Sequence, residues 1–231
     1  MTLADIREAI EAQGLTWRGA FCPEDDDCQE FGEIGTLVLA GFVGRGNWPA
    51  FRASPESGDD QPDPLDRWSR RIIGGLADAL RARAIFPFDG PPWAPFQRWA
   101  LKAEPLYASP LGMLIHPDWG LWHAWRGALA FDERFALPGR DIRPSPCDSC
   151  IEKPCLGACP VSAFSSSGYD LHACLAHIDS PAGADCMELG CRARRACPVG
   201  AQHRHDPDEA LFHMTAFRNA VRGGLVPARS G

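Results

Sequence analysis

The sequence contains no apolar run that approaches the length of a membrane-spanning helix. Its first residues, MTLADIREAI, lack the basic and apolar regions of a secretory signal. It also lacks an excess of basic residues, because 23 Lys and Arg face 30 Asp and Glu, for a formal net charge of -7. Contacts with nucleic-acid phosphates need clustered Lys and Arg. We therefore expect a cytoplasmic protein that binds neither a membrane nor nucleic acid.

The chain is long enough, at 231 residues, for one large domain or two modest ones. Alternating helix and strand patterns over residues 1–143 predict an α/β (α+β) domain with a mixed sheet. We expect helices at 2–13 and 65–83, a buried strand at 36–43, and further strands at 15–21, 85–88, 111–116 and 122–131. A last helix starts at Asp206, the expected N-cap, with Glu209 as its capping-box partner.

Structural disulfides are rare in a reducing compartment, so we expect the ten cysteines to bind metal or to have a redox role. Eight of them follow Pro144-Ser-Pro146, which we expect to be a hinge, and they form two motifs. These are Cys147-x2-Cys150-x4-Cys155-x3-Cys159-Pro160, and Cys174, Cys186, Cys191 and Cys197-Pro198. Each half ends with nearly the same five residues, CPVSA and CPVGA, which is an internal repeat typical of two-cluster ferredoxins.

In such ferredoxins, three cysteines of one half share a cluster with the Cys-Pro cysteine of the other half. The pattern therefore predicts one [4Fe-4S] cluster on the first set and a second on the other set: Cys147, Cys150, Cys155 and Cys197; then Cys159, Cys174, Cys186 and Cys191. The spacing is looser than in standard ferredoxins, and four thiolates also suit zinc. One cluster in place of two, and a structural zinc protein, remain open alternatives.

The domains predicted in this way are 1–143, α/β; 144–205, a small double-[4Fe-4S] ferredoxin-like domain; and 206–231, a C-terminal helix and tail. Cys22 and Cys28 flank an acidic run that should raise their thiol pKa values. We expect a buried, free Cys22 and a surface Cys28, although their role stays open. His203 and His205 follow Cys197 and are expected to be solvated or to tune the nearby cluster.

With the cysteines placed, the chain resembles a shortened epoxyqueuosine reductase. The order of the eight cysteines matches that family, and Leu114-Ile-His-Pro-Asp-Trp-Gly120 and Gly127-Ala-Leu-Ala-Phe-Asp132 resemble two of its stretches. Phe88-Asp89-Gly-Pro-Pro92 lies where the family has a turn with a proton-donating aspartate. The family's Gly-Lys segment is replaced by Tyr107-Ala-Ser-Pro-Leu-Gly112.

The resemblance implies a cobalamin-binding type of α/β domain in front of the cluster module, with Asp89 as a catalytic acid and His116 as a cofactor contact. The leading hypothesis is an iron–sulfur electron-transfer protein that serves a redox partner protein or a small-molecule acceptor. A second hypothesis is an oxidoreductase in which the clusters reduce a corrinoid, or a flavin, held by the α/β domain. The third is the structural zinc protein. Substrate, reduction potentials and oligomeric state are not predicted.

Overall fold

The computed structural model describes residues 1–24, 27–165 and 168–224, and it divides into two compact units. Unit 1 comprises Met1–Leu106 and His123–Arg143, and unit 2 comprises Tyr107–Trp122 and the chain from Pro144 onward. The predicted limit near residue 143 recurs here. However, residues 107–122 and the last helix lie with the cysteines, because Leu111, Ile115 and Leu121 share an apolar core with Cys155 and Cys197. Separate domains stay a prediction.

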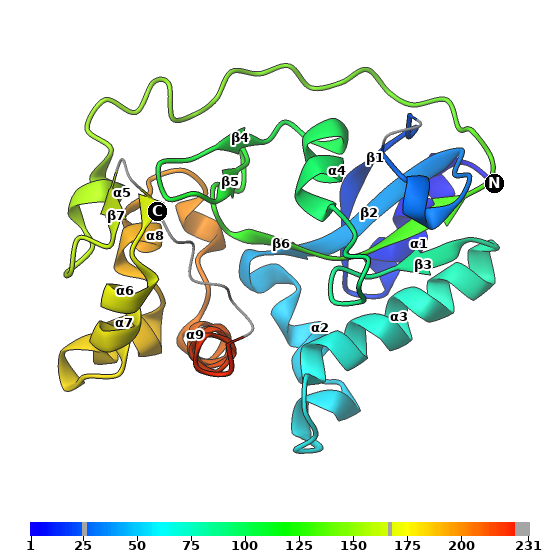
Figure 1. Ribbon diagram of the computed structural model, residues 1–231. Helices are drawn as coiled ribbons and strands as arrows, with labels where there is room; N and C mark the ends of the chain where they lie inside the picture. The colour runs from blue at the N-terminus through cyan, green and yellow to red at the C-terminus, as the bar shows by residue number, and fades with distance from the viewer. Residues whose placement is uncertain (25–26, 166–167, 225–231) are drawn as a thin grey trace. The chain divides into compact units, whose positions relative to one another are not determined.

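Unit 1 is built on a four-stranded sheet in the order β1-β2-β6-β3, which confirms the predicted α/β (α+β) class (Figure 1). Its strands are β1 (Thr16–Phe21), β2 (Thr36–Val43), β3 (Arg83–Ile85) and β6 (His123–Phe131). Every pair among these described strands is antiparallel, so the sheet is not mixed as expected. The alternation of helix and strand suggested parallel crossovers, but long-range pairing decided the direction of each strand.

The central strand β2 is buried at all eight positions, as its unbroken apolar run predicts. The helices of unit 1 are α1 (Leu3–Ala12), α2 (Trp48–Arg52), α3 (Pro64–Leu80) and α4 (Phe96–Ala103). Helices α1 and α3 contact each other and the sheet, while α4 packs on β1 (Figure 1). Helix α4 was not predicted, because prolines surround it and its length is only eight residues.

Unit 2 consists of short elements joined by tight turns. Its strands are β4 (Tyr107–Ala108), β5 (Leu114–Ile115), β7 (Phe164–Ser165) and β8 (Gly168–Tyr169). Its helices are α5 (Pro154–Gly157), α6 (Leu171–Ile178), α7 (Ala184–Leu189), α8 (Arg192–Ala196) and α9 (Pro207–Arg222). Within the described ranges, no helix is long and apolar enough to span a bilayer.

The start of α9 differs from the prediction in one respect. Asp206 is the N-cap residue and Pro207 opens the helix, but no side-chain capping bond forms at Asp206. The carboxylate of Glu209 turns instead toward the imidazoles of His205 and His213. His205 is partly buried, with 11% of its side chain exposed, so it is not freely solvated; the alternative expectation, that it tunes the nearby cluster, stays a prediction.

Candidate metal centre

The first group of cysteines forms where two short helices of unit 2 meet. Pro154 starts α5, which carries Cys155, and α5 packs against α8, which ends immediately before Cys197. Cys155 and Cys197 are buried together, and Cys147 packs on the same apolar core. The two residues that lengthen the spacing between Cys150 and Cys155 include Pro154, so the extra length accommodates the start of α5.

The thiols of this group influence one another electrostatically. Burial, followed by the charges of Cys197, Cys155 and Cys150, raises the pKa of Cys147. Burial and the charges of Cys197 and Cys150 likewise raise the pKa of Cys155. Mutual repulsion of this kind arises only between sulfurs that are near one another, and it is relieved when the thiolates share a cation.

The second group gathers around a pocket. Cys159 follows α5, Cys174 lies in α6, Cys186 lies in α7, and Cys191 precedes α8. All four line one pocket with an empty volume of about 330 Å³, part of which is open to solvent. Burial and the charges of Cys191, Cys159 and Cys186 act to raise the pKa of Cys174. These four cysteines therefore lie around one pocket. Cys147, Cys155 and Cys197 share an apolar core on which Cys159 and Cys191 also pack, so the predicted division into two sets of four ligands stays a prediction.

Several features suit these groups to hold metal. All ten cysteines of the chain are free thiols, so no disulfide competes for them. The backbone N–H of Ala163 donates to the sulfur of Cys159 at 3.3 Å, and the hydroxyl of Tyr169 donates to that of Cys174. Such donors stabilise a thiolate and tune a bound metal centre. Free thiols with such donors suit thiolate-bound metal centres, either a cubane cluster or zinc.

Two turns of unit 2 touch backbone to backbone and so position Cys197. Gly200, in the CPVGA stretch, has φ +68°, and a Cβ there would lie 2.3 Å from the carbonyl carbon of Trp119. Gly120 has φ +60°, and a Cβ there would lie 2.0 Å from the carbonyl oxygen of Val199. Only glycine at both positions allows this approach.

His116 helps to order the turn at residues 116–120. Its ring is 4% exposed and stacks on Trp119 with centroids 3.9 Å apart. Its Nδ1 accepts hydrogen bonds from the backbone N–H groups of Asp118, at 3.1 Å, and Trp119, at 3.4 Å. As the structure stands, His116 is engaged with its own turn, so its predicted role as a cofactor contact stays a prediction.

Asp89, the predicted acid, lies in unit 1 and forms a bidentate ion pair with Arg70 of α3. Arg70 Nη1 donates to Asp89 Oδ2 at 3.0 Å, and Nη2 donates to Oδ1. The Arg70 guanidinium also lies over the rings of Phe86 and Phe88. Because both carboxylate oxygens are occupied, proton donation by Asp89 would first require Arg70 to be displaced. That role also stays a prediction.

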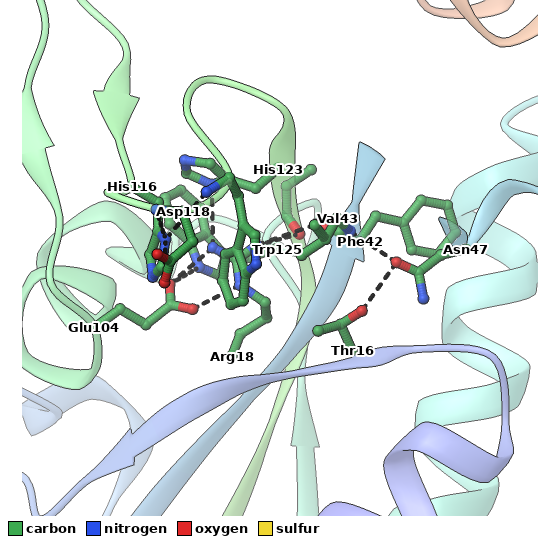
Figure 2. Close-up of polar contacts among 12 residues, drawn as sticks. Thr16, Arg18, Phe42, Val43, Asn47, Glu104, His116, Asp118, His123 and Trp125 are labelled. Carbon is green, nitrogen blue, oxygen red and sulfur yellow. Dashed lines mark hydrogen bonds and ion pairs between the residues drawn. The ribbon is translucent and has the colours of Figure 1, made fainter. Parts of the chain in front are cut away.

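A buried charged network in unit 1 has no counterpart in the sequence-based prediction. Arg18 is fully buried in β1, and its guanidinium donates to Glu104 Oε1 at 2.6 Å and Oε2 at 2.8 Å (Figure 2). Its remaining donors reach the carbonyl oxygens of Phe42 and Ala124, and Nδ1 of His123. Every N–H of the guanidinium is therefore used inside the protein. An arginine within a predicted strand was the only signal in the sequence.

Cys22 and Cys28 are the two cysteines outside these groups, and neither is in the environment predicted for it. Cys28 is buried, at 5% exposed, and burial followed by the charge of Asp27 raises its pKa to about 11. Cys22 is only partly buried. The expectation of a buried Cys22 and a surface Cys28 was wrong, because the turn after β1 folds Asp27 and Cys28 inward against α4. There the carbonyl of Asp27 accepts a hydrogen bond from Trp99 at 2.9 Å.

Comparison with known proteins places this geometry in a known fold. No protein-family model and no curated protein sequence matches the chain. Three solved epoxyqueuosine reductase structures match it at TM-scores of 0.52–0.54 and 13–14% identity, over 89–90% of this chain and 68% of theirs. One is a complex with an epoxyqueuosine-modified tRNA-Tyr stem loop, and one, from Bacillus subtilis, has its catalytic loop swung out of the active site.

The chain has an epoxyqueuosine reductase-like fold. The predicted resemblance is therefore confirmed at the level of the fold. At this identity the comparison carries over no activity, cofactor or substrate.

Proposed function

We propose that this protein is an iron–sulfur electron-transfer protein that holds two [4Fe-4S] clusters. The observation that supports the proposal is that the eight predicted ligands are all free thiols, four of them around one pocket and Cys147, Cys155 and Cys197 on one apolar core. Cys147, Cys150, Cys155 and Cys197 would hold one cluster, and Cys159, Cys174, Cys186 and Cys191 the other. When bound, such clusters supply one-electron transfer.

The chain's own residues support this role through the environment of the thiols. Apolar side chains from β5 and α8 exclude water from the first group, since Ile115 and Ala193 are at most 1% exposed. The Ala163 N–H and the Tyr169 hydroxyl donate to sulfurs of the second group. Burial and donor contacts of this kind are the means by which a protein sets a reduction potential. The acceptor would be a redox partner protein or a small molecule.

A second candidate function is that of a reductase, and the fold favours it. The three matching structures are named as reductases, and their similarity extends over both units of this chain. In this proposal unit 1 would bind a corrinoid or a flavin, with Asp89 as the proton donor. Asp89 and His116 are both engaged by protein groups, so neither fits a cofactor contact as it stands. The net charge of -7 disfavours a tRNA substrate.

Metal analysis of the anaerobically purified, reconstituted chain tests the leading proposal. We expect about eight irons and eight sulfides per chain, and about four of each in Cys197→Ala and in Cys159→Ala, because each variant removes one ligand from one group. Cys22→Ser is the matched control and should keep the full iron content, since Cys22 lies in unit 1. Zinc without iron in the wild-type chain would overturn the proposal.

The two variants also test the assignment of ligands to groups. If two separate centres exist, the double variant Cys197→Ala with Cys159→Ala should lose nearly all its iron. If Cys159 and Cys197 were ligands of one and the same cluster, either single variant would already lose nearly all its iron. For the second candidate, hydroxocobalamin or flavin is added to the loaded chain. A shift of the ligand's absorbance bands supports a reductase, and unchanged bands leave an electron carrier.

A further inference from the structure

Three potential metal ligands outside the cysteine groups lie together at the start of α9. His205 directly precedes the N-cap residue, and Glu209 and His213 follow at intervals of four along the helix. His205 Nε2 lies 3.5 Å from Glu209 Oε1, and His213 Nε2 lies 3.8 Å from the same oxygen. The ligand atoms of the three side chains all lie within 4.8 Å of one another. We call these residues the α9 triad.

The carboxylate at the centre of the triad is deeply buried and only partly satisfied. Glu209 is 1% exposed, and its Oε2 has no hydrogen-bond partner among the described residues. Buried carboxylates are normally paired, fully hydrogen-bonded or bound to a metal. Both imidazole contacts to Oε1 are longer than an N–H···O hydrogen bond, which usually measures about 2.7–3.2 Å. An orphaned carboxylate oxygen beside two imidazole nitrogens is a set of donor atoms that a cation would satisfy.

Arg194 is the nearest alternative source of positive charge. It interacts electrostatically with Glu209, but Nε and Nη2 of its guanidinium donate to the carbonyl oxygen of Leu121 at 3.1 and 2.7 Å. The guanidinium also lies 4.2 Å from the centre of the Trp122 ring. Arg194 therefore balances part of the charge of Glu209 without occupying its free oxygen.

The His205 ring lies among buried groups, and burial, followed by the charges of Arg194 and His213, lowers its pKa to about 2. His205 also packs edge-on against Trp122, with ring centroids 5.1 Å apart, which restricts its orientation.

We propose that His205, Glu209 and His213 bind a divalent transition-metal ion of the Zn²⁺ class, with a fourth position left to water. Two imidazoles and a carboxylate are a common ligand set for zinc. A tetrahedral ion about 2.1 Å from each ligand atom would separate those atoms by about 3.4 Å. The observed 3.5 and 3.8 Å are close to that value. One-third of the His213 side chain is exposed, which leaves a route for the ion to enter.

Zinc binding to the full chain, with its cysteine sites already loaded, tests the proposal. After equilibration with Zn²⁺, the wild-type chain should hold one more zinc than Glu209→Gln or His213→Ala. X-ray absorption at the zinc edge should show nitrogen and oxygen ligands at about 2.0–2.1 Å, whereas zinc bound to thiolates would show sulfur at about 2.3 Å. Zn²⁺ should also raise the melting temperature of the wild type but not that of Glu209→Gln.

His203→Ala is the matched control, because His203 precedes the triad but is not part of it. It should bind zinc as the wild type does. Glu209→Gln keeps the shape of the side chain, so its loss of zinc cannot be ascribed to misfolding if its circular dichroism is unchanged. The proposal is overturned if the wild type binds no extra zinc, if all its zinc is bound to sulfur, or if both triad variants bind zinc as tightly as the wild type. None of these outcomes depends on whether the cysteines hold iron.

Discussion

Replacing Gly200 with alanine tests whether the turn after Cys197 must touch the turn that ends at Gly120. The new Cβ would lie 2.3 Å from the carbonyl carbon of Trp119 and 2.4 Å from its oxygen, both of them backbone atoms. Gly200 also has φ +68°, a left-handed conformation. That conformation costs a residue with a Cβ about 1–2 kcal/mol. Forcing two packed segments apart costs about 1–3 kcal/mol more. We therefore expect Gly200→Ala to destabilise unit 2 by about 2–5 kcal/mol.

The matched control is Gly157→Ala, a substitution in the other Cys-Pro half of the repeat. A Cβ at Gly157 would meet no atom within 4 Å, and the residue lies in α5 without a left-handed φ. Alanine there should be neutral or slightly stabilising, by about 0.5–1 kcal/mol. Thermal unfolding followed by circular dichroism and by metal release measures both variants. We expect Gly200→Ala to melt roughly 10 °C or more below Gly157→Ala.

Equal melting temperatures and equal metal retention in the two variants would refute this reasoning. They would mean that the turns at Gly120 and Gly200 separate at little cost and do not position Cys197. A loss of stability without any loss of metal would refute the positioning role alone.

Three further predictions concern contacts that the sequence did not reveal. Arg18→Ala removes the ion-pair partner of the buried Glu104, so urea unfolding should show a free energy of unfolding lower by about 3–5 kcal/mol. Replacing both residues with apolar ones of similar size should recover most of this loss. Arg71 forms an ion pair with Glu56 and lowers the pKa of that carboxyl from 4.5 to about 2. The stability advantage of the wild type over Glu56→Gln should therefore be full above pH 4.5 and disappear as the pH falls toward 2. Tyr169→Phe removes a donor from Cys174 and should shift one reduction potential negatively, on the order of tens of millivolts, equivalent to about 1 kcal/mol for one electron.

Each of these predictions has a clear contrary result. A double replacement at the Arg18 pair that is no more stable than Arg18→Ala would show that the unpaired charge is not the cause. A gap between wild type and Glu56→Gln that persists at pH 2 would exclude the ion pair as its origin. Identical potentiometric curves for Tyr169→Phe and the wild type would remove the hydroxyl from any tuning role.

Local pattern accounts for the parts of the fold that were predicted. The apolar run Thr36–Val43 predicted a buried strand, and the strand is buried at every position. The repeated Cys-Pro segments predicted which cysteines would bind the same cluster. In two-cluster ferredoxins, the Cys-Pro cysteine of one half is a ligand of the cluster held by the other half. Each of these signals can be recognised in short stretches of the sequence without knowledge of the fold.

Long-range packing decided what the sequence alone did not. The turn after β1 buries Cys28 where an acidic run suggested a surface residue, because Trp99 of the unpredicted helix α4 holds that turn. Arg70 engages Asp89, 19 residues further along the chain, and Arg18 of β1 meets Glu104, 86 residues further along.

The order of its cysteines therefore predicted the kind of chemistry that this protein can support and the thiols that would support it. The tertiary structure alone decided which of the other polar side chains are buried, and with what partners. The physical reason is that motif spacing reports on neighbours along the chain, whereas burial and charge pairing depend on contacts between residues far apart in sequence.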